Sequence, residues 1–166
     1  MPARPPSDAV VALRSLGRRF RGLFAGHEHD ESPDELAHRL GPDGHSALDH
    51  VVAATRTITF LGRALQQVLV EDDPVLHPGV ADPSARDFGA APDGPVDDRL
   101  AELAWEADAL ADRVQHEPAD AWARQGRVAG ADAPVSALSV LWDAVDSAVE
   151  HLRAAERTLA AVRGRG

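Results

Sequence analysis

Apolar residues recur at helical spacing in four segments of the chain, at about 7–25, 46–70, 95–114 and 134–162. Residues three or four positions apart fall on the same side of an α-helix, so each segment has one apolar face that can enter a core. The third segment has the most regular spacing, with Val96, Leu100, Leu103, Ala107, Leu110 and Val114. No segment shows the sustained alternation of apolar and polar residues that strands would give. The pattern therefore predicts four amphipathic helices.

The connections at 26–45 and 71–95 lack this spacing. The second contains five prolines and three glycines in 25 residues, which is too irregular for a helix and too long for a simple turn. We expect an ordered crossover or a lid there. The chain is thus predicted to be a single all-α domain over 1–166, with its core at about 7–163. Its architecture is a four-helix bundle with a long irregular connection between the second and third helices.

The composition narrows the classes of function. The chain has 166 residues, no cysteine and a formal net charge of -10. Without cysteine, a metal ion could be held only by imidazole or carboxylate groups. The negative charge argues against binding to nucleic acid. No apolar stretch reaches the roughly 20 residues that span a bilayer, and the N-terminus lacks the apolar core of a signal peptide, so we expect no membrane partner and a cytoplasmic location.

All 17 basic residues are arginine, which suggests a GC-rich genome of the actinobacterial type. One region of the chain is basic, because residues 1–25 carry a single acid and five arginines: Arg4, Arg14, Arg18, Arg19 and Arg21. This region could be a basic amphipathic helix for a membrane surface or an acidic partner. It is more simply the solvated face of the first core helix.

Three stretches resemble, in their order and spacing, segments of the DinB-like (DinB/YfiT-type) four-helix-bundle superfamily of bacterial metalloenzymes. They are PDGHSALDHVVAATRTITFLGRALQQVLVEDDP at 42–74, ADAWARQGRVAG at 119–130 and DSAVEHL at 146–152. The first is similar to the family's second helix with its acidic end, and the second to the turn before the last helix. The third occupies the place of the family's His-x-x-x-His-His-Leu motif. The resemblance covers nearly the whole chain and implies the bundle fold.

The resemblance also implies where a metal site would lie. The family holds a divalent ion with one histidine early in the second helix and two histidines four residues apart on the last helix, and it leaves one coordination position open. These positions fall at Ala53, Asp146 and Glu150, so none of the three is a histidine in this chain. His151 corresponds to the second of the family's adjacent histidines. The substitutions argue against the family's ordinary metal-dependent activity.

The residues that are present could rebuild a site. Asp146 and Glu150 are one helical turn and about 40° apart, so their carboxylates could converge. His50 lies three residues before Ala53 and would complete a site of one imidazole and two carboxylates. Such a hard donor set favours manganese, iron or magnesium over zinc or nickel. Residues that could surround this site or line a pocket are Trp142, Asp143 and His151.

The same helix face has two other interpretations. Asp143, Arg153 and Arg157 lie on the same side of the helix as Asp146 and Glu150, as in a solvated face with salt bridges. The two carboxylates could also be a pair that transfers protons.

A second cluster, HEHDE at 27–31, could chelate a metal ion. Because no helix fixes these side chains, a solvated linker is the simpler interpretation. The three tryptophans, Trp105, Trp122 and Trp142, are interpreted mainly as packing residues.

These observations leave three hypotheses for the function. The first is a DinB-like bundle that lacks the three-histidine site, holds no metal or an atypical one, and binds a small ligand. The second is a metal-dependent transferase in which a divalent ion (Mn, Fe, Ni or Zn) activates a low-molecular-weight thiol such as mycothiol, as the resemblance implies. The third is a structural module that forms a homodimer. Catalytic residues cannot be assigned from the sequence.

Overall fold

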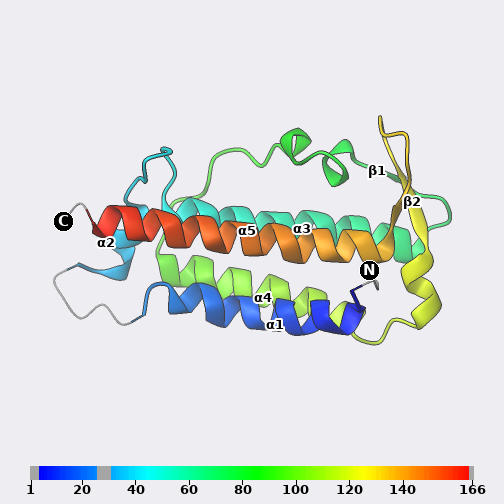
Figure 1. Ribbon diagram of the computed structural model, residues 1–166, viewed down its shortest axis with the longest axis horizontal. Coiled ribbons are helices and arrows are strands. Elements are labelled where there is room, and N and C mark those ends of the chain that lie inside the picture. Colours follow the sequence, from blue (N-terminus) through cyan, green and yellow to red (C-terminus); the bar gives the residue numbers. More distant parts are fainter. Residues whose placement is uncertain (1–3, 26–30, 165–166) are drawn as a thin grey trace.

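The computed structural model describes residues 4–25 and 31–164, and it confirms the all-α four-helix bundle. The four long helices are α1 (Pro6–Gly22), α3 (Ala47–Val70), α4 (Val96–Val114) and α5 (Ala137–Arg163). Their bounds lie close to those that the apolar spacing predicts. The helices pack mainly as two pairs, α3 with α5 and α1 with α4 (Figure 1). Further contacts of α3 with α4 and of α1 with α5 close the bundle.

The core lies between these four helices and contains the predicted apolar stripes. Leu13, Leu61, Leu103 and Leu141, one from each long helix, are fully buried. Burial of a leucine side chain contributes about 1.5–3 kcal/mol, so the stripes supply the main driving force for folding. Trp122 also packs into this core, whereas Trp105 is 68% exposed.

Side-chain caps fix where two of the helices begin. Ser46 and Asp49 form a capping box at the start of α3, in which each side chain accepts a hydrogen bond from the other residue's backbone N–H. Ser136 and Ser139 form the same arrangement at the start of α5. These bonds satisfy backbone groups that have no partner within the helix.

The connection at 26–45 contains a helix that the apolar spacing does not predict. This helix, α2 (Pro33–His38), begins with a capping box between Ser32 and Glu35 and buries Leu36 and Ala37 against the bundle. A helix of six residues has fewer than two turns, which is too short to show a periodic pattern, and the sequence analysis therefore missed it.

A small sheet is the second departure from the sequence prediction. It consists of β1 (Val75–Leu76), β2 (Gln125–Val128) and β3 (Val135–Ser136). β1 pairs with β2 in parallel, and β2 pairs with β3 in antiparallel orientation. Strands of two to four residues cannot show sustained alternation. The sheet fastens one end of the crossover at 71–95 to the segment that precedes α5.

The crossover is ordered and runs along α3 and α5 for most of their length (Figure 1). It contains two 3₁₀ turns, η1 (Pro78–Val80) and η2 (Pro83–Ala85), and a third, η3 (Ala119–Ala123), precedes β2. The guanidinium of Arg56 on α3 donates hydrogen bonds of 2.7–3.2 Å to three consecutive carbonyl oxygens at 88–90. The crossover is therefore held at a second point, close to its far end.

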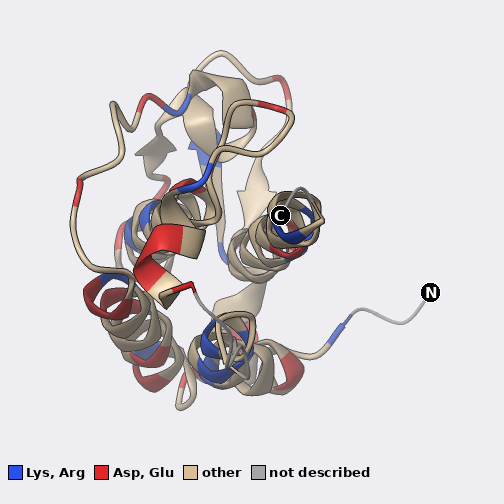
Figure 2. Cartoon of the chain, turned by 90° about the vertical axis from the view of Figure 1, so that its left-hand side faces the viewer, with Lys and Arg blue, Asp and Glu red and all other residues tan. Residues whose placement is uncertain are grey.

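The basic residues of the first helix lie on its outer side. α1 buries Leu13, Leu16 and Phe20, while Arg14 and Arg18 are exposed. This arrangement is the solvated face of a core helix. Figure 2 shows the bundle end-on, with acidic and basic segments distributed around its outside. In the described ranges 4–25 and 31–164, no helix is both long enough and apolar enough to cross a membrane.

Candidate functional site

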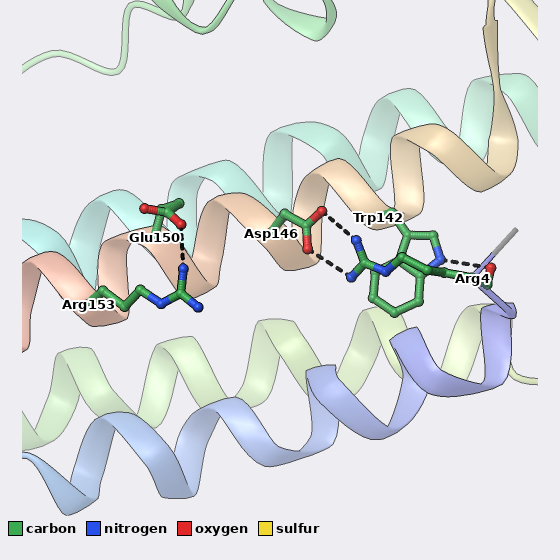
Figure 3. A network of polar contacts seen from close by, with 5 residues as sticks. All are labelled: Arg4, Trp142, Asp146, Glu150 and Arg153. Carbon is green, nitrogen blue, oxygen red and sulfur yellow. Dashed lines mark hydrogen bonds and ion pairs between the residues drawn. The ribbon is translucent and has the colours of Figure 1, made fainter. Parts of the chain in front are cut away.

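The two predicted ligands of α5, Asp146 and Glu150, each pair with an arginine (Figure 3). Asp146 accepts two hydrogen bonds, of 2.8 and 2.9 Å, from the guanidinium of Arg4. Glu150 accepts one hydrogen bond of 2.8 Å from Arg153. The side chains of Asp146 and Glu150 are 54% and 65% exposed. These contacts agree with the interpretation of this helix face as a solvated face with salt bridges.

The predicted ligand on α3, His50, lies beside His151 of α5. The centroids of the two rings are 6.2 Å apart, and the ring of His45 lies 5.9 Å from that of His50 on its other side. The pair arises because α3 and α5 pack tightly and each presents one histidine at the edge of its core face. The sequence analysis singled out both residues but did not place them next to each other.

Neither imidazole of this pair has a hydrogen-bond partner in the part of the chain that the structure describes. The Nε2 atom of His50 is completely buried and finds no partner among residues 4–25 and 31–164. Buried polar atoms are almost always hydrogen-bonded, to protein, water or a ligand, because an unsatisfied one costs about 1–3 kcal/mol. This atom therefore marks a place where a further group is expected.

Burial keeps both histidines neutral. The pKa of His151 is lowered to about 4, first by burial and then by the charges of His50 and Arg86, against a smaller opposing effect of Glu150. The pKa of His50 is also lowered, first by burial. At neutral pH each ring thus offers one N–H donor and one acceptor nitrogen.

Arg86 from the crossover brings a positive charge to the same place. Its Nε donates a 2.6 Å hydrogen bond to the carbonyl oxygen of Gly79, and its guanidinium lies 5.7 Å from the centre of the Phe60 ring. Within the described residues, its two terminal nitrogens make no hydrogen bond. Burial lowers the pKa of Arg86, and the carboxylate of Asp143 opposes this effect.

Asp143 is the fourth polar group of the cluster. The loss of hydration in its surroundings raises the pKa of Asp143. The charge of Arg86 opposes this change, and the charge of Asp146 adds to it. Asp143 is nevertheless exposed to solvent, at the outer edge of the cluster. Asp143 and Arg86 attract each other electrostatically but do not form an ion pair.

His50, His151, Arg86 and Asp143 thus form a polar cluster at the boundary of α3, α5 and the crossover. Arg86 is the member that the sequence analysis missed. A signal was present, because Arg86 is the only basic residue between Arg63 and Arg99. A single arginine in a long connection is a candidate for a contact with the bundle once the connection packs against it. The residue that it contacts cannot be predicted from the sequence spacing.

The donor set does not fit a three-ligand metal site. Over residues 4–25 and 31–164, no three histidine, aspartate or glutamate side chains gather as they would around a metal ion. Asp146 and Glu150 both accept hydrogen bonds from arginines in this structure, and the rearranged site of His50, Asp146 and Glu150 stays a prediction. Most of the HEHDE cluster, residues 27–30, lies outside the described residues. Its last residue, Glu31, pairs with Arg39.

A separate cavity of about 430 Å³ lies between α3, α4 and the crossover. It is lined by the rings of Phe60 and Phe88 and by charged side chains that include Arg63 and Glu106. Its volume is in the range of small-molecule sites. Trp142, expected near a pocket, does not line this cavity and instead contacts Arg4.

Comparison with known proteins gives a structural match. No protein-family model matches the chain, and no curated protein matches it in sequence. Among solved structures, it is similar to YfiT from Bacillus subtilis, described as "a probable metal-dependent hydrolase with an unusual four-helix bundle topology". The TM-score is 0.70 at 12% sequence identity, over 95% of this chain and 87% of YfiT. Because the identity is so low, the match bears on architecture alone. The chain has the DinB/YfiT-like four-helix-bundle fold.

Proposed function

We propose that this protein binds a small molecule with a carboxylate group at the polar cluster of His50, His151, Arg86 and Asp143, without the three-histidine metal site of DinB-like proteins. The observation that carries the proposal is the buried Nε2 of His50, which has no partner among the described residues. His151 adds unused polar atoms beside His50, and the charge of Arg86 acts on His151. A ligand that satisfied these atoms together would gain affinity from groups that the fold already holds in place.

Each side chain has a distinct role in this proposal. The planar guanidinium of Arg86 suits the two oxygens of a carboxylate, which it can bind with parallel hydrogen bonds. The neutral rings of His50 and His151 can each donate to, or accept from, a hydroxyl or carbonyl group of the ligand. Asp143 balances the charge of Arg86 when the ligand is absent.

The proposal can be tested by NMR titration with benzoate, acetate and succinate. The ring C–H signals of His50 and His151, assigned with the His50→Gln and His151→Gln variants, should shift in a saturable manner with at least one of these anions. Arg86→Gln should weaken binding about 10- to 100-fold, because it removes charged hydrogen bonds. Arg21→Gln makes the same change of charge at an exposed position of α1 and should bind like the wild type.

Two results would overturn the proposal. One is the absence of any saturable shift with all three anions. The other is equal affinity of the Arg86→Gln and Arg21→Gln variants, which would show that the anion binds elsewhere. A thermal melt of each variant establishes that the comparison is made between folded proteins.

A metal-dependent enzyme is the second candidate function, either a hydrolase of the kind described for YfiT or a thiol transferase. The adjacent rings of His50 and His151 favour it, because paired imidazoles are common metal ligands. A third ligand would have to come from outside the groups that the described residues bring together.

Elemental analysis separates the two candidates. Protein prepared without a histidine tag, after supplementation with Mn, Fe, Ni or Zn, should contain far less than one metal ion per chain if the first proposal holds. Near-stoichiometric metal that is lost in His50→Ala or His151→Ala would support the enzyme. Asp146→Ala and Glu150→Ala complete the series, because the sequence analysis places ligands at these positions.

A further inference from the structure

Arg4 contacts Trp142 and Asp146 of α5 through its guanidinium and through its backbone (Figure 3). The guanidinium carbon of Arg4 lies 3.3 Å from the centre of the Trp142 ring system. Two of its nitrogens donate hydrogen bonds of 2.8 and 2.9 Å to the two carboxylate oxygens of Asp146. The indole N–H of Trp142 donates a 3.1 Å hydrogen bond to the backbone carbonyl oxygen of Arg4.

These contacts select an arginine residue within a peptide. The paired hydrogen bonds require a planar fork of donors, which lysine does not have. The flat guanidinium also stacks on the indole, and arginine is found above aromatic rings more often than lysine is. The bond to the carbonyl oxygen recognises the backbone, so free guanidinium would satisfy only part of the site. Trp142 and Asp146, one turn apart on α5, hold both recognition elements in a fixed relation.

The chain supplies its own ligand for this site. Arg4 is followed by Pro5, which is in an extended conformation (φ -69°, ψ 148°), and by Pro6, the first residue of α1. Proline restricts both its own backbone and that of the residue before it. The backbone of Arg4 therefore has few conformations relative to α1. This pre-organisation favours docking within the same chain.

The contact is also exposed enough to exchange. The side chains of Arg4 and Asp146 are 52% and 54% exposed, and exposed ion pairs contribute about 0–1 kcal/mol, with two-bond pairs such as this one at the upper end. An arm held this weakly leaves the site open part of the time, which gives another peptide access to it.

We propose that Trp142 and Asp146 form a receptor for an arginine residue in an extended peptide, which Arg4 of the same chain fills at rest. An arginine-containing segment of another protein binds there when Arg4 leaves. The neighbouring ion pair of Glu150 and Arg153 has no ring beneath it and only one hydrogen bond. It therefore provides a matched comparison on the same helix. This proposal does not depend on the polar cluster.

Tryptophan fluorescence can test the receptor with the peptide acetyl-Ala-Arg-Pro-Pro-amide. The Arg4→Ala variant should show a saturable change in emission, with an affinity in the millimolar range that so few contacts can give. Wild type should bind the peptide about fivefold more weakly, because Arg4 competes for the site. When added to Arg4→Ala, the substitution Asp146→Asn should abolish peptide binding, and Glu150→Gln should leave it unchanged. Trp142→Phe identifies the source of the signal, because Trp105 and Trp122 remain.

Several outcomes would overturn the proposal. They are the absence of a saturable change in Arg4→Ala up to about 10 mM peptide, an equal response of the Asp146→Asn variant, and equal binding of a peptide with lysine in place of arginine. A wild-type dimer that becomes a monomer on Arg4→Ala substitution would overturn the assignment of Arg4 to its own chain. Circular dichroism of Arg4→Ala, which removes only an exposed contact, verifies that the bundle is intact.

Discussion

Replacement of His151 by glutamine should make the protein less sensitive to acid. Because the folded state lowers the pKa of His151 to about 4, the unfolded chain binds a proton more readily than the folded one. The wild type therefore has its full stability above the unfolded pKa of about 6.5, loses it as the pH falls toward 4, and loses no more from this residue below that pH. Glutamine keeps a polar side chain at the position and removes the titration.

The size of the effect follows from the two pKa values. At pH 4.5, proton linkage gives a loss of about 2.5 kcal/mol of unfolding free energy from a pKa of about 4 against about 6.5. His151 is only partly buried, so solvent reduces this figure and we expect about 1–2.5 kcal/mol. Burial is the main cause of the shift, and the charged or titratable groups that add to it or oppose it, His50, Arg86 and Glu150, all remain in the variant.

Urea unfolding followed by circular dichroism at pH 7 and pH 4.5 measures this effect. The wild type should lose about 1–2.5 kcal/mol more than His151→Gln between the two pH values, while acid effects on other groups cancel in the comparison. His116→Gln, which removes an exposed imidazole after α4, should follow the wild type. Parallel pH dependence of wild type and His151→Gln would refute the argument.

Three further predictions concern the scaffold. Gly17→Val should lower the unfolding free energy by about 1–3 kcal/mol in a urea titration, because a Cβ at this position would lie 2.6 Å from the Cβ of Ala104; an unchanged midpoint would contradict this contact between α1 and α4. Ser136→Ala should cost about 1 kcal/mol by thermal melting, since it removes the cap of α5. Arg56→Ala should speed limited proteolysis in the crossover by releasing three carbonyl groups, whereas Arg63→Ala, on the same helix, should not.

The long helices could be predicted because their apolar residues repeat over five or more turns. Leu103 and its neighbours at three and four positions leave one helical face for the core, whatever the partner helix is. The short elements could not be predicted in this way. β1 contains Val75 and Leu76 alone, and its partner, β2, begins 50 residues later in the sequence, at Gln125. Pairing over such a separation is decided by the packed bundle rather than by the local sequence.

The polar residues show the same division. His50 could be singled out from its place on the second helix and His151 from the resemblance to the family's histidine motif, and the two helices place them together. The partner of Asp146 could not be foreseen, because Arg4 is separated from it by 142 positions along the chain. The place of Arg86 likewise depends on the path of the crossover. Spacing within one helix therefore identified the helix face but not the contacts that its side chains make.

The pairing of helices in this bundle has a consequence for the rate of folding. The two main helix pairs, α3 with α5 and α1 with α4, each join helices that are separated in sequence by another long helix. The chain must close large loops before either pair can form, which slows folding relative to a bundle whose consecutive helices pack as hairpins. We therefore expect stopped-flow refolding to be slower than is usual for helical domains of this length. During synthesis, α5 must also leave the ribosome before α3 can pack against its principal partner, so the largest helix pair of this fold forms late.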